Sequence, residues 1–144
     1  MATKQSGTVV RCAVLKAVVM AALVLPGVAL ADACGRVSTF FEGPETKHVY
    51  EARIGVIDSN NVLLETPEHR LSPGKHELRI YEFIDAPELK VPARHRGYGK
   101  ILTLEVEANK VYRIGARFNH LKPFDRNEFW EPVVWQVSDQ PCEK

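Results

Sequence analysis

Apolar and polar residues alternate along two neighbouring segments in the C-terminal half of the chain. In residues 101–107 the even positions are apolar and the odd positions from 103 on are polar or charged, and residues 112–118 repeat the alternation. A period of two predicts β-strands that bury one face.

We expect these two segments to form a hairpin. One face of the pair is buried only if even positions lie opposite even positions. A three-residue loop satisfies this by pairing Val106 with Tyr112 and Glu105 with Arg113. Such loops usually end in a residue with positive φ, which is Lys110 here, although Asn109 suits that conformation better.

A second hairpin is predicted upstream. Residues 49–57 alternate with period two, and residues 62–65 return to β-prone composition. The intervening residues 58–61 are Asp-Ser-Asn-Asn, which tolerate positive φ and bond their own backbone. This order predicts strand, turn and strand over 49–65.

The next turn signal is Ser-Pro-Gly-Lys at residues 72–75, which fits a type II turn. In the following strand, 76–84, apolar residues occupy even positions as far as Ile80, and then Tyr81 and Phe83 occupy odd ones. The change of parity indicates a β-bulge or burial on both faces.

Short β-prone runs at 37–41 and 133–137 complete the set of predicted strands, and Trp135 in the second run is expected in the core. Residues 85–99 and 119–131 are predicted to be long loops. No segment sustains a 3.6-residue apolar period outside the first 31 residues. The fold class expected is therefore all-β, a single β-sandwich of about seven antiparallel strands.

Residues 1–31 have the composition of a secretory signal peptide. Three basic residues precede the apolar run 17–25, and Ala29-Leu30-Ala31 supplies small residues at alternate positions for cleavage. The run is shorter than the roughly 20 residues that span a bilayer, so we expect no membrane span after cleavage. The β-sandwich domain is then residues 32–144, in the periplasm or secreted.

The charge of this domain bears on its partners. Of the 19 Lys and Arg residues, 3 lie in the leader, which leaves 16 against 18 Asp and Glu. A slightly acidic balance gives no general attraction to nucleic acid, so we expect no nucleic-acid partner.

Only Cys34 and Cys142 remain after the leader is removed. Two cysteines in an oxidising compartment usually pair, which predicts a disulfide with Cα atoms roughly 4.4–6.8 Å apart. The alternative is an envelope lipoprotein that carries its lipid on Cys34 and leaves Cys142 unpaired.

Two segments carry a resemblance to a known group of domains. One is Leu71 to Leu78, which contains a Pro-Gly-Lys-His turn, and the other is Leu102 to Tyr112, which contains an acidic strand, a turn and Val-Tyr. They are similar to small exported β-sandwich domains of the PEGA-like and uncharacterised-lipoprotein kind. The resemblance implies an envelope-associated fold with a non-enzymatic role, and it implies no particular functional residues.

The sequence offers no catalytic, metal or cofactor signature. The five histidines lack the short spacings of zinc or copper sites, although histidines distant in sequence could meet in space. No Gly-x-Ser-x-Gly motif is present. We therefore expect no catalytic residues, no metal and no cofactor. A small hydrolase or metal-dependent enzyme with a site assembled from distant residues remains the alternative.

The loop of residues 94–100 is the candidate binding site. It gathers three fixed positive charges, an imidazole and a phenol on a Gly-containing segment. The candidate ligand-binding residues are Arg94, His95, Arg96, Tyr98 and Lys100. Arginine offers bidentate bonds to a phosphate, a sugar acid or an acidic protein face, so the expected partner is an anionic ligand or an envelope protein.

Two further expectations concern the loops. Replacing Arg94 and Arg96 by alanine should leave stability nearly unchanged, because exposed loop charges contribute little to folding. In the loop 119–131, Phe124, Phe129 and Trp130 are expected to tuck over the end of the sandwich rather than to face a partner.

Overall fold

The structure, a computed structural model, describes residues 33–142, so the predicted leader 1–31 lies outside the described residues. Its elements other than strands are two 3-10 turns, η1 (Glu45–Lys47) and η2 (Ala93–His95). The strands are β1 (Gly35–Ser38), β2 (Val49–Tyr50), β3 (Ala52–Ile57), β4 (Asn60–Asn61), β5 (Glu68–Leu71), β6 (Gly74–Glu82), β7 (Lys100–Val106), β8 (Lys110–Phe118) and β9 (Trp130–Asp139). Within residues 33–142 no helix has the length and apolar character needed to cross a bilayer.

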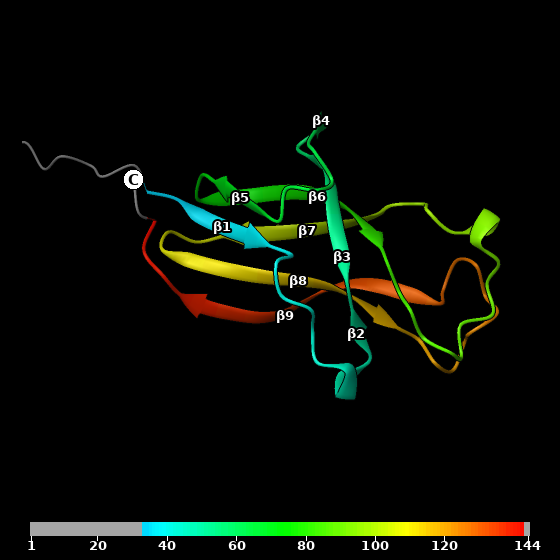
Figure 1. Cartoon of the computed structure of the whole chain (residues 1–144). Coiled ribbons are helices and arrows are strands. Elements are labelled where there is room, and N and C mark those ends of the chain that lie inside the picture. Colours follow the sequence, from blue (N-terminus) through cyan, green and yellow to red (C-terminus); the bar gives the residue numbers. More distant parts are fainter. Residues whose placement is uncertain (1–32, 143–144) are drawn as a thin grey trace, which may run out of the picture.

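Two packed sheets confirm the all-β sandwich, with nine strands rather than seven (Figure 1). One sheet has the order β4-β3-β6-β7. In the other sheet β9 pairs with one edge of β8, β1 and β2 pair with different stretches of its other edge, and β5 follows β1. β1 runs parallel to β8, and the other strand pairs are antiparallel.

The core fills the space between the two sheets, where the inward side chains of both meet. It consists of aliphatic and aromatic side chains contributed by both sheets and by the loops. The most deeply buried side chains are Phe129, Ile54, Leu78, Ile80, Ile114, Val37 and Val106.

The expected hairpin over 101–118 is wrong, because β7 and β8 belong to different sheets. Glu105 pairs with Lys75 of β6, and Arg113 pairs with Gln136 of β9. The alternation itself is correct, since the even positions of both strands face the core. The connection crosses between the sheets, and its positive φ of 60° falls on Asn109.

The predicted hairpin over 49–65 is confirmed only at its tip. β3 pairs with the short β4, and the two turn residues Asp58 and Ser59 have φ of 47° and 67°. β2 instead joins β8 in the other sheet, so the chain changes sheets at Glu51. Residues 62–65 form no strand.

The bulge expected in 76–84 lies in the neighbouring strand. The register shifts between Ile54 and Val56 of β3, while β6 keeps its even positions inward as far as Glu82. Phe83 is consequently exposed. At the start of β6, Gly74 has a φ of 132°, which favours glycine, although β5 and β6 on either side of the turn lie in different sheets.

Trp135 lies outside the core cluster, contrary to expectation. It is half-buried near the register shift of β9. The guanidinium carbon of Arg113 lies 5.7 Å from the centroid of its ring and 4.4 Å from that of Phe41. Arg113 and Trp135 occupy strand positions that alternate away from the core, and with Phe41 they form a small cation–π cluster.

The predicted disulfide joins the two ends of the described chain. Cys34 precedes β1, Cys142 follows β9, and their Cα atoms are 6.0 Å apart, inside the predicted range. Figure 1 shows both ends at one side of the sandwich, with the loops that follow β6 and β8 at the opposite side. The bridge therefore closes the end remote from the candidate site.

Candidate binding cleft

A cleft of about 250 Å³ lies between the loop 85–99 and the loop 119–129. The two loops meet at one end of the sandwich (Figure 1), and the backbone N–H of Lys90 donates to the carbonyl of Pro123 at 3.0 Å. The lining residues are His95, Arg96, Gly97, Tyr98, Lys100, Arg126, Asn127, Phe129 and Trp130. The cleft thus brings together four of the five predicted binding residues, and Arg94 lies beside it on η2.

Arg96 is held by a carboxylate from the interior. Its Nε and Nη2 donate to the two carboxylate oxygens of Glu82 at 2.8 and 2.7 Å, and Nη2 also donates to the carbonyl of Ile84 at 2.7 Å. The Glu82 side chain is only 2% exposed. These hydrogen bonds to Glu82 raise the pKa of Arg96, so the guanidinium keeps its charge.

The expectation that Arg96 is an exposed loop charge is therefore wrong, and it no longer follows that its loss leaves stability unchanged. Its guanidinium compensates a buried negative charge and cannot at the same time be fully available to a ligand. A signal for this was present in the sequence, because Glu82 shares the parity of Leu78 and Ile80 on the buried face of β6. A carboxylate on an apolar face requires a cation or several donors.

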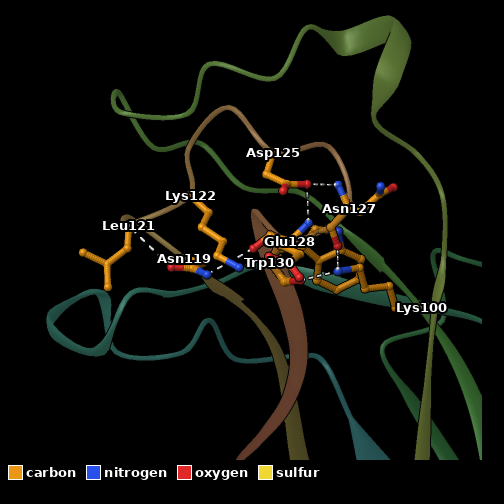
Figure 2. A network of polar contacts seen from close by, with 8 residues as sticks. All are labelled: Lys100, Asn119, Leu121, Lys122, Asp125, Asn127, Glu128 and Trp130. Atoms are coloured by element: carbon orange, nitrogen blue, oxygen red, sulfur yellow. Dashed lines mark hydrogen bonds and ion pairs between the residues drawn. The ribbon is translucent and has the colours of Figure 1, made fainter.

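Lys100 joins β7 to the second loop. Its Nζ donates to the carbonyl oxygens of Asn127 at 2.6 Å and Trp130 at 2.5 Å, as Figure 2 shows. It also lies 5.2 Å from the centroid of the Trp130 ring. Burial lowers the pKa of this lysine. Lys100 thus brings positive charge to the cleft and fixes the position of its far wall.

The loop 119–129 also holds its own shape (Figure 2). The carboxylate of Asp125 accepts the backbone N–H groups of Asn127 and Glu128 at 2.9 and 3.2 Å, which forms a local turn. Lys122 and Glu128 form an ion pair across the loop. The wall of the cleft is therefore built by side chains of the loop itself.

The tucked loop is confirmed for two of its three aromatic residues. Phe129 and Trp130 are buried at the end of the sandwich, whereas Phe124 is 76% exposed. Phe129 and Trp130 form the floor of the cleft. The expectation for Phe124 is wrong: this residue lies inside the turn that the N–H of Asp125 closes by donating to the carbonyl of Lys122 at 3.2 Å, and it is exposed there.

Three groups remain available to a ligand. Arg126 lines the cleft and forms no ion pair or hydrogen bond within residues 33–142. Tyr98 is 69% exposed. His95 is half-buried, and its Nε2 accepts a hydrogen bond from Nε of Arg94 at 3.3 Å.

Charge in the cleft is of one sign. Its lining has three cationic side chains, of which Arg96 is paired with the buried Glu82, and no carboxylate is among the lining residues of the described chain. Since a bidentate guanidinium binds carboxylates and phosphates, Arg126 can hold an acidic group while Tyr98 covers an apolar face of the same molecule.

His76 was missed as a structural residue, although it shares the inward parity of Leu78. Its Nδ1 lies 2.6 Å from a carboxylate oxygen of Asp58 and its Nε2 lies 2.7 Å from the carbonyl of Ser72. Both partners are acceptors, so both ring nitrogens must carry protons. Burial acts to lower the pKa of His76, but the bonds to Asp58 and Ser72 outweigh it and raise the pKa. A charged imidazole therefore joins two turns.

Within residues 33–142 no group of three or more His, Cys, Asp or Glu side chains is placed to hold a metal ion. No family model, curated protein or solved structure matches the chain. The resemblance to PEGA-like domains stays a prediction.

Proposed function

We propose that the chain is an exported, non-catalytic binding module whose cleft takes a small ligand with an acidic group. The observation that carries the proposal is the lining of the cleft, which combines the unpaired Arg126, an exposed Tyr98 and no carboxylate within the described residues. A volume of about 250 Å³ suits a ligand of monosaccharide scale better than a protein segment. An acidic group at the end of a larger envelope component would enter in the same way.

The disulfide supports a role in the cell envelope. The Cys34–Cys142 bridge suits an oxidising compartment. The bridge also uses the sulfur that a lipid on Cys34 would need, which favours the soluble periplasmic or secreted form over the lipoprotein alternative. An intact mass of the exported protein tests this, since a diacylated Cys34 adds hundreds of daltons.

Isothermal titration calorimetry with sodium glucuronate, inorganic phosphate and glucose tests the binding. Glucuronate and glucose share a ring and differ in the carboxylate, so the proposal requires heat from glucuronate and none from glucose. Arg126→Ala should weaken glucuronate about tenfold or more, because a hydrogen bond to a charged group contributes roughly 1.5–3 kcal/mol.

Arg70→Ala is the matched control. Arg70 is an exposed arginine of β5, away from the cleft. If the Arg126→Ala and Arg70→Ala variants bound glucuronate with equal affinity, the cleft would not be the binding site. If glucose bound as well as glucuronate, the site would not require an acidic group.

A further inference from the structure

Two exposed histidines from distant parts of the chain meet at the β2 side of the sandwich. The ring centroids of His48 and His120 are 4.7 Å apart, and the ring planes are inclined by 36°. The rings border a cavity of about 270 Å³ that Lys47, Arg117 and Glu131 also line. This site is separate from the binding cleft, with which it shares no lining residue.

The backbone holds His48 in place. Its N–H donates to the carbonyl of Glu45 at 2.8 Å, and its own carbonyl accepts the N–H of Phe118 at 2.8 Å. His48 has a φ of 56°, a left-handed conformation at the end of η1 where glycine or asparagine is usual. Histidine is among the non-glycine residues that adopt this conformation most often, and the two backbone hydrogen bonds fix the point from which its side chain projects.

The ring nitrogens of this pair are free within the described residues, where no hydrogen bond involves them. The other histidines differ. Both nitrogens of His76 have partners, Nε2 of His95 accepts a bond from Arg94, and Nε2 of His69 is buried. His48 and His120 are thus the exposed imidazoles best able to bind a ligand through nitrogen.

The separation of the rings fits two ligands on one metal ion. With metal–nitrogen bonds of about 2.0–2.1 Å, the metal lies about 3.2 Å from each ring centroid. Two such rings lie about 4.5 Å apart at a 90° angle and about 5.2 Å apart at the tetrahedral angle. The observed 4.7 Å falls between these values.

The charged lining residues leave one positive charge near the site, which the bonds from the two imidazoles must outweigh. Glu131 pairs with Arg117 at 2.5 Å, so that arginine is neutralised, and Lys47 is the remaining positive lining residue. The cavity leaves room for water on the other coordination positions. Imidazole ligands suit Zn²⁺, Cu²⁺ and Ni²⁺ rather than Mg²⁺ or Ca²⁺.

We propose that His48 and His120 together form a two-histidine site for a divalent transition metal, completed by water. The test is calorimetric titration of NiCl₂ into the protein prepared without a histidine tag. We expect one ion per chain. Either His48→Asn or His120→Asn should weaken binding by about tenfold or more, because a second ligand held in place adds a large effective concentration.

The variants are chosen to preserve the fold. Asparagine tolerates the left-handed conformation at position 48, and both positions are exposed, so melting temperatures should stay close to that of the wild type. His95→Asn is the control for an imidazole outside the pair and should leave Ni²⁺ affinity unchanged.

The double variant gives the sharpest outcome. If the two rings bind one ion, His48→Asn/His120→Asn is little weaker than either single variant, because each single change already destroys the chelate. Independent losses from the two changes, an unchanged affinity, or an equal loss in His95→Asn would each overturn the proposal.

Discussion

Replacing Arg96 by alanine should destabilise the fold far more than a change in a surface loop usually does. The variant leaves the Glu82 carboxylate, whose side chain is 2% exposed, with the N–H of Ile84 as its remaining donor among the described residues. Removing one partner of a buried ion pair costs about 3–5 kcal/mol. Because 25% of the Arg96 side chain is exposed, water partly replaces it and we expect about 3 kcal/mol.

Thermal unfolding followed by circular dichroism measures this cost. At about 4 °C per kcal/mol for a domain of this size, the melting temperature should fall by about 12 °C. The neighbouring Arg94→Ala is the matched control: Arg94 is exposed and has no ion pair within residues 33–142, so its loss should stay within about 0.5 kcal/mol.

A second variant separates the buried charge from general damage to the loop. Glu82→Gln/Arg96→Ala removes the charge and keeps a side-chain oxygen for the Ile84 N–H, so it should recover part of the lost stability. The assignment of Arg96 to a buried ion pair is refuted if Arg96→Ala has the same melting temperature as Arg94→Ala. It is also refuted if the double variant has a lower melting temperature than Arg96→Ala.

Sequence periodicity predicted which side chains face the core, but it could not predict the partner of each strand. The even positions of β7 and of β8 point to the core whether the two strands pair in one sheet or pack across the sandwich. Parity is therefore the same in a hairpin and in a crossing connection. The choice between them depends on non-local pairing, here with β6 and β9.

The candidate site was predicted only in part, because the contacts of its residues are also non-local. Composition located the basic loop, and four of its five candidate residues line the cleft. The role of each residue depended on partners far away in sequence, such as Glu82 for Arg96 and Asn127 for Lys100. Two polar residues on the apolar parity of β6, His76 and Glu82, were the available signal for buried charge pairs.

Three further predictions test the stabilising contacts. Reducing the Cys34–Cys142 bridge with dithiothreitol should lower the free energy of unfolding by about 2–5 kcal/mol in urea titrations, and an unchanged midpoint would contradict this. Because its pKa is raised on folding, His76 stabilises the fold fully below about pH 6.5 and less as the pH rises through its folded value. The melting temperature should therefore fall above that pH, and His76→Gln should flatten this dependence; a parallel fall in the variant would assign it to other groups. Lys100→Met should speed amide hydrogen exchange in residues 119–129, and unchanged protection there would show that the ammonium does not hold the loop.

The most direct test of the binding cleft is a map of where an acidic ligand binds. In a ¹H–¹⁵N correlation spectrum titrated with sodium glucuronate, we expect saturable shifts at Tyr98, Arg126, Asn127 and the Trp130 indole, all lining residues of the cleft. The same titration with glucose should leave those signals in place. Shifts centred on another face of the sandwich, or equal shifts with glucose, would contradict the proposal that this cleft binds an acidic group.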